Sequence, residues 1–135
     1  MAPEPEESKP PVRLDKPSST GTGLTAKLIS VRAVEAKAQL PGEITGPALA
    51  VTIEVSNTGA RPADLGSVVV IVFGSDTAPG AEMTAAPAEP LAGRLVAKKR
   101  ARGVYVYRVP KDRRRPVTVT VSIGDAPVLV FTGNA

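Results

Sequence analysis

The residue types in this 135-residue chain exclude most kinds of catalytic and metal-binding chemistry. The chain has no cysteine and no histidine, so it has no disulfide, no zinc site with the usual ligands and no nucleophile–base pair that uses either residue. The remaining acid–base candidates in residues 24–135 are Glu35, Glu43, Glu54, Asp64, Asp76, Glu82, Glu89, Asp112 and Asp125. No two of them have the spacing of a catalytic acid and base or of a calcium loop. We therefore predict a protein that is not an enzyme and that uses no metal or cofactor.

Basic side chains are the strongest functional signal in the sequence. Residues 98–115 hold nine of the 17 lysines and arginines and one acid, a local net charge of +8 in a chain of net charge +4. Clustered cations attract polyanions because binding releases condensed counterions. The candidate polyanion-binding residues form two groups, Lys98, Lys99, Arg100 and Arg102 in the first, and Lys111, Arg113, Arg114 and Arg115 in the second.

The two basic groups flank a strand expected at residues 103–109. Seven extended residues span about 23 Å, farther than the screening length of about 8 Å in physiological salt, so the groups would act as two separate small sites. The simpler interpretation is that they are solvated turn residues that also protect sheet edges from aggregation. The alternative is an anionic surface, such as phospholipid headgroups or phosphorylated wall polymers. We do not expect nucleic acid as the partner, because no aromatic residues alternate with the cations.

The elements that would position these groups have the patterns of β-strands. In residues 48–57, Val51, Ile53 and Val55 alternate with polar residues, as in a strand with one buried face, whereas the continuous apolar run 67–74 indicates a central strand buried on both faces. The six expected strands are 24–34, 48–57, 67–74, 102–110, 117–124 and 127–133.

The stretch between Gly74 and Leu95, which follows the third of these strands, is too long for a bare loop. We expect at least one short edge strand there, at 81–85 or 91–96. The sequence contains no convincing amphipathic helix. These features predict an all-β fold, an immunoglobulin-like antiparallel β-sandwich of about seven strands with no major helix.

Two turns are predicted to be structural. Asn57 and Gly59 end the strand 48–57, because asparagine tolerates a left-handed conformation and bonds its own backbone two residues on, and glycine tolerates a positive φ. Gly124 and Asp125 form the tight turn before the last strand. A less favoured hypothesis is an isopeptide crosslink between Lys27 and Asn57, which would release one ammonia.

Residues 1–23 have the composition of a disordered tether. They contain five prolines and end in the sequence SSTGTG, so they offer little apolar surface to offset the entropy of ordering. The predicted organisation is therefore a tether over residues 1–23 and a single immunoglobulin-like domain over residues 24–135.

Three stretches together resemble a known family. AVTIEVSNTGARPADL, AKKRARGVYVYRVPKD and PVTVTVS resemble bacterial extracytoplasmic immunoglobulin-like domains, in particular the immunoprotective-extracellular-protein-like superfamily of lipoprotein and secreted domains. The resemblance covers residues 24–133 and implies an extracytoplasmic, non-catalytic module whose partner is a protein or a cell-envelope component. It also implies that a secretion signal or an anchor lies outside this chain. The basic turn Lys98–Arg102 departs from the family, which has a glycine and an acid there, and the residue usage resembles that of a high-GC actinobacterium.

Overall fold

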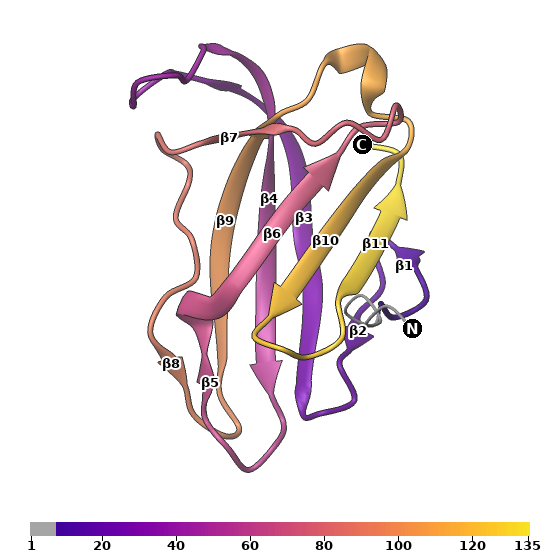
Figure 1. The fold of residues 1–135 in the computed structure, drawn as a ribbon, viewed down its shortest axis with the longest axis vertical. Coiled ribbons are helices and arrows are strands. Elements are labelled where there is room, and N and C mark those ends of the chain that lie inside the picture. The colour runs from indigo at the N-terminus through magenta and orange to yellow at the C-terminus, as the bar shows by residue number, and fades with distance from the viewer. Residues whose placement is uncertain (1–7) are drawn as a thin grey trace, which may run out of the picture.

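Two β-sheets pack face to face in the structure of the protein, a computed structural model that describes residues 8–135 (Figure 1). The strand order of the four-stranded sheet is β1 (Val12–Arg13), β11 (Leu129–Gly133), β10 (Val117–Ile123) and β6 (Val68–Phe73). The strand order of the five-stranded sheet is β2 (Ser18–Ser19), β3 (Leu24–Ala36), β4 (Gly46–Asn57), β9 (Arg100–Arg108) and β7 (Ala81–Met83). The remaining elements are the two-stranded ribbon of β5 (Ala63–Asp64) and β8 (Arg94–Leu95) and the single-turn 3-10 helices η1 (Leu65–Ser67) and η2 (Lys111–Arg113).

The predicted fold class is confirmed. Each of the six expected strands is present, and the two candidate positions for a short edge strand both hold one, β7 and β8. Within residues 8–135, seven strands have three residues or more, and the other four have two. Neighbouring strands pair antiparallel except for β1 with β11.

The main core lies between the two sheets and is almost entirely aliphatic. Val51 and Ile53 of β4, Val119 and Val121 of β10, and Phe131 of β11 are completely buried there. Each such side chain contributes about 1.5–3 kcal/mol through removal of apolar surface from water. The alternation predicted for β4, and the same alternation in the burial of β10, is therefore the pattern that builds this core.

A second, smaller apolar cluster lies on the outer face of the five-stranded sheet. Ala48, Ala50, Val106 and Met83 are buried in it. Ala88, from the segment that follows β7, packs against this cluster, and a backbone bridge between Glu89 and Val104 ties the segment to β9. The inner and outer faces of β4 are therefore both largely buried.

The prediction that residues 67–74 form a central strand is wrong. β6 is an edge strand of the four-stranded sheet, and Val69 on its outer face is 54% exposed. The edge is nevertheless protected, because the carbonyl of Val72 accepts a hydrogen bond from the Gly80 amide at 2.7 Å and the carbonyl of Val70 accepts one from the Tyr107 hydroxyl. Valine and isoleucine favour strands even where they are partly exposed, so a continuous apolar run does not distinguish an edge strand from a central one.

The prediction of a disordered tether also differs from the structure over residues 8–23. β1 pairs with β11, β2 pairs with β3, and the Lys9 amide donates to the Val128 carbonyl at 2.8 Å. Val12 and Leu14 pack against the main core, and Ser18 is buried. Proline is tolerated on edge strands, where an amide donor is not needed, and so the proline-rich composition does not prevent this docking. Residues 1–7 lie outside the described part of the chain.

Candidate functional site

The structure places the two predicted basic groups at opposite ends of β9. Lys98, Lys99, Arg100 and Arg102 lie at its start, next to the turn that follows β4, whereas Lys111, Arg113, Arg114 and Arg115 lie beyond its end, in and after η2 (Figure 1). We call the first end, with the turns at residues 57–64, 94–100 and 123–126, the loop end. The two groups therefore cannot bind one small ligand together.

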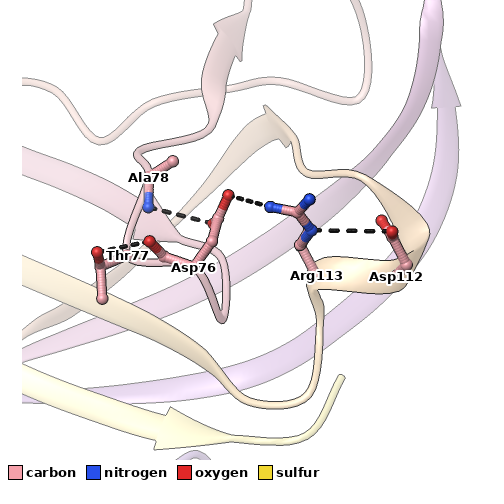
Figure 2. Close-up of polar contacts among 5 residues, drawn as sticks. All are labelled: Asp76, Thr77, Ala78, Asp112 and Arg113. Atoms are coloured by element: carbon pink, nitrogen blue, oxygen red, sulfur yellow. Dashed lines mark hydrogen bonds and ion pairs between the residues drawn. The ribbon is translucent and has the colours of Figure 1, made fainter.

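Two residues of the second group are bound within the protein. Arg114 is only 7% exposed, and its Nε and Nη2 atoms donate to the Val109 carbonyl at 3.1 and 2.9 Å. Arg113 pairs with Asp76 and, at 3.8 Å, with Asp112 (Figure 2). Lys111 is exposed, like Arg115. This group therefore presents much less unpaired charge than its sequence indicates.

The ion pair of Arg113 fixes the loop between β6 and β7 to η2. Figure 2 shows the Asp76 carboxylate between the Ala78 amide, which donates to it at 3.2 Å, and the Arg113 guanidinium. The Ala78 hydrogen bond and the charge of Arg113 hold the pKa of Asp76 below its usual value. The Arg113–Asp76 pair therefore links the β6–β7 loop to η2.

In the first group, one acid neutralises part of the charge. Glu54 of β4 lies opposite Arg102 of β9 and Lys27 of β3 in the strand register, and its carboxylate is 2.9 Å from Arg102 and 3.9 Å from Arg100. The Arg102 hydrogen bond and the nearby charges of Arg100 and Lys27 lower the pKa of Glu54. Arg102 is thus the principal partner of Glu54, and Arg100 keeps most of its guanidinium exposed.

Lys98 and Lys99 lie in an exposed turn that the end of β4 holds in place. The Lys98 amide donates to the Asn57 carbonyl at 2.7 Å, and the Asn57 amide donates to the Lys99 carbonyl at 2.9 Å. Lys98 has a φ of 66°, a left-handed conformation that few non-glycine residues adopt. Within residues 8–135, neither lysine forms an ion pair.

Asn57 joins three turns of the loop end. Its side-chain amide donates to the carbonyls of Arg61 at 2.7 Å and Leu95 at 2.8 Å, and its Oδ1 accepts the Gly59 amide at 3.0 Å. The side-chain bond to the backbone two residues on is as predicted, but neither Asn57 nor Gly59 has a positive φ. The close approach here requires glycine at Gly23, where a Cβ would lie 2.8 Å from the Gly59 Cα, whereas a Cβ on Gly59 would make only ordinary contacts.

The structure does not support the crosslink hypothesis. Lys27 is exposed on the outer face of its sheet, where it faces Glu54, whereas the Asn57 amide is buried and bound to two carbonyls.

The other predicted turn lies at the same end of the sandwich. Gly124 has a φ of 56°, and exposed Asp125 follows it between β10 and β11.

Two open hollows adjoin each other at the loop end, and Asn57 lines both. The larger, of about 590 Å³, lies between the turns near residues 22–24, 57–67 and 123–126. The smaller, of about 260 Å³, is lined by Ser56, Asn57, Thr58, Lys98, Lys99 and Arg100. Ser56 and Thr58 were not predicted as site residues, because nothing in the sequence indicates that the end of β4 lies beside residues 98–100.

The charge at the two ends of the sandwich differs. Within residues 24–135, the loop end carries seven cations and three acids, a net charge of +4: Lys27, Arg61, Arg94, Lys98, Lys99, Arg100 and Arg102 against Glu54, Asp64 and Asp125. In the same part of the chain, the opposite end carries six cations and five acids: Lys37, Arg108, Lys111, Arg113, Arg114 and Arg115 against Glu35, Glu43, Asp76, Glu82 and Asp112. The described residues contain no cluster of three or more acids that could hold a metal ion.

Comparisons with known proteins identify the fold. No protein-family model and no curated protein sequence matches the chain. Among solved structures, the yjhA protein of Bacillus subtilis is 12% identical with a TM-score of 0.69, over 88% of this chain and 96% of that one. A secreted protein of Mycobacterium tuberculosis, MPT63, is 14% identical with a TM-score of 0.66, over 92% of this chain and 98% of that one.

A third similar structure is a candidate lipoprotein of Bacillus subtilis, ycdA. It is 16% identical with a TM-score of 0.68, over 91% of this chain and 39% of that one, so this chain spans about two fifths of its length. In residues 8–135 no helix is long and apolar enough to cross a bilayer. These likenesses agree with the fold that the family resemblance implies, and the chain has the β-sandwich fold of these proteins.

Proposed function

We propose that the chain is a non-catalytic module that works outside the cytoplasm, either secreted or attached to the cell envelope. The observation that carries the proposal is the shared fold with a protein described as secreted and with a candidate lipoprotein. In this proposal the partner is a protein or a component of the envelope. The absence of histidine and cysteine from the sequence is in keeping with a module that binds and does not catalyse.

The loop end is the binding surface in this proposal. Loops on a rigid sandwich commonly carry recognition, since they vary without disturbing the core. Here the two open hollows lie among such loops, and the Asn57 hydrogen bonds hold the loops in one arrangement. A surface that is already ordered loses less conformational entropy when a partner binds.

A second candidate function is binding to a polyanion or an anionic surface. The sequence assigns this role to both basic loops, 98–102 and 111–115. The internal bonds of Arg113 and Arg114 weaken the case for the second loop, whereas exposed Lys98 and Lys99 support the first. Polyanion binding is therefore proposed at the loop end only.

Protease accessibility in intact source cells tests the location. We expect a C-terminally tagged product of the complete gene to be digested from outside or found in the medium, while a cytoplasmic marker stays protected. Recovery of the tagged protein with the cytoplasmic marker would refute the proposed location.

A photo-crosslinking residue placed at Thr58 tests whether the loop end contacts the partner, with the exposed residue Thr77 near the opposite end as its control. Crosslinks to a partner from Thr58 and not from Thr77 are expected.

A further inference from the structure

We propose that the smaller hollow at the loop end binds phosphate groups of a soluble, linear polyanion. This inference rests on the proposed function, because it names the class of ligand that the loop end takes. The hollow, which we call the phosphate cleft, is the one lined by residues 56–58 and 98–100. The ligand class is a polymer with a phosphate in each repeat, recognised through its charge.

The chemistry of the lining fits a phosphate group. The ammonium groups of Lys98 and Lys99 and the guanidinium of Arg100 supply three cations, and Ser56 adds a hydroxyl. No carboxylate lines this hollow, which is open to solvent and has a volume of about 260 Å³. Cationic donors make the strongest hydrogen bonds to phosphate oxygens, so an anion would replace water around all three cations at once.

The protein keeps the nearest acid from neutralising the cleft. Glu54 accepts its short hydrogen bond, 2.9 Å, from Arg102, which lies directly opposite it on β9 and two residues beyond Arg100. Arg100 is 3.9 Å from Glu54, and its side chain is 74% exposed. Arg102 therefore satisfies the carboxylate, and the guanidinium of Arg100 retains donors that face solvent.

The backbone of the cleft is ordered by hydrogen bonds across its walls. Asn57 exchanges hydrogen bonds with Lys98 and Lys99, and the Thr58 amide and hydroxyl both donate to the Gly23 carbonyl, at 2.8 and 3.2 Å. The two lysines therefore project from a turn of fixed shape. Only their side chains need to become ordered when an anion binds.

The placement of apolar and aromatic side chains favours a soluble phosphate polymer over a bilayer or a nucleic acid. Stable binding to a bilayer surface takes an inserted apolar group as well as cations. The exposed residues Leu40 and Ile44 lie between β3 and β4, in the hairpin that Figure 1 shows at the opposite end of the sandwich. Val96 is the one large exposed apolar residue near the cleft within the described chain. Tyr105 and Tyr107 are buried, so the cleft offers no aromatic surface on which bases would stack.

The adjoining larger hollow gives a polymer a path away from the cleft. Arg61 lines this hollow and adds a fourth cation, but Asp64 and Asp125 line it too. The phosphate cleft, which has cations alone, is therefore the place where a repeat unit binds most tightly.

Titration of the full chain with inorganic polyphosphate at a series of salt concentrations tests the proposal. Three phosphate contacts to a flexible polyanion predict that log K falls with log salt with a slope of about −2, or a roughly 16-fold loss of affinity from 50 to 200 mM. The double variant Lys98→Gln/Lys99→Gln is expected to bind roughly 50-fold more weakly at 50 mM, with a slope of about −0.7. The matched control Lys111→Gln/Arg115→Gln removes the same charge from exposed residues of the opposite end and is expected to change affinity by less than about threefold.

Three results would overturn the inference. The first is no binding of polyphosphate at 50 mM salt. The second is an equal loss of affinity in both double variants, which would mean that net charge alone attracts the polymer. The third is tighter, Lys98- and Lys99-dependent binding to phosphatidylglycerol vesicles or to single-stranded DNA than to polyphosphate. None of these results bears on protease accessibility in cells or on crosslinking from Thr58, so the proposed function can stand if the ligand class fails.

Discussion

Replacing Asn57 with aspartate changes one amide group into a carboxylate of the same shape at the centre of the loop end. The acceptor for the Gly59 amide remains, but the two donor hydrogens that face the carbonyls of Arg61 and Leu95 are lost. Those carbonyl oxygens lie 2.7 and 2.8 Å from the amide nitrogen, so the new oxygen atom would face both of them. The side chain is 2% exposed, and water has little access to compensate.

The expected cost follows from the groups left without partners. The buried Leu95 carbonyl that loses its donor costs about 1–3 kcal/mol and the part-buried Arg61 carbonyl costs less. The buried charge adds to this, so the free energy of unfolding should fall by roughly 3–5 kcal/mol at pH 7. That loss is a large fraction of the 5–15 kcal/mol typical of a domain. Burial favours the neutral form of the introduced carboxylate. Its pKa is then higher in the folded than in the unfolded state, and the deficit relative to wild type should shrink as the pH falls towards 4.

Urea denaturation followed by far-ultraviolet circular dichroism at pH 7 and pH 4.5 measures both effects. The control is Asn134→Asp, which makes the same change in charge at an exposed residue near the C-terminus and should alter stability by no more than about 0.5 kcal/mol. If Asn57→Asp unfolds within 1 kcal/mol of this control at pH 7, the Asn57 bonds do not hold the loop end together, and the reasoning is refuted.

Three further perturbations test other contacts of the fold. A methyl group added by Gly103→Ala would lie 2.7 Å from Leu91, so thermal unfolding should show a loss of about 1–3 kcal/mol; an unchanged melting temperature would contradict this packing. Tyr107→Phe removes the hydroxyl that donates to the Val70 carbonyl and should cost about 1–3 kcal/mol. Because burial raises the pKa of Tyr107, wild-type stability should decline as the pH rises above 10, and Tyr107→Phe should decline less steeply in alkaline urea titrations. The pKa of Glu54 is lowered, so its contribution is present above its unfolded pKa and is lost as the pH falls through its folded pKa; Glu54→Gln should flatten the stability profile below pH 5, and an unchanged profile would argue against the ion pair.

The sequence predicted the strands well because their alternation reflects burial directly. Tyr105, Tyr107 and Val109 stand at alternate positions of the strand expected at 102–110, and all three are in the main core. The position of a strand in its sheet cannot be read from this alternation, because it depends on which segments of the chain pair. β6 has the composition of a central strand and lies at an edge, where a tyrosine hydroxyl and a glycine amide from other segments cover its carbonyls.

The docking of residues 8–23 could not be predicted for a similar reason. Composition indicates how much apolar surface a segment can bury by itself, and this segment has little. Val12 and Leu14 nevertheless complete a core that the rest of the chain has built, and the edges of β11 and β3 supply ready hydrogen-bonding partners. A short segment can therefore become ordered on an existing sheet although it would stay disordered alone.

The basic segment shows how pairing decides which charges remain available to a ligand. The strand register places Glu54 beside Arg102, and the β6–β7 loop brings Asp76 to Arg113, but both acids are distant in sequence from the cations that they neutralise. Within residues 8–135, the predicted binding residues left with neither an ion pair nor a buried bond are Lys98 and Lys99 at the loop end, and Lys111 and Arg115 at the other. Each end thus has two such cations, while the charged residues counted for residues 24–135 sum to +4 at the loop end and +1 at the opposite end. Since the two double variants remove equal charge, any difference between them in polyphosphate binding measures the effect of these surroundings.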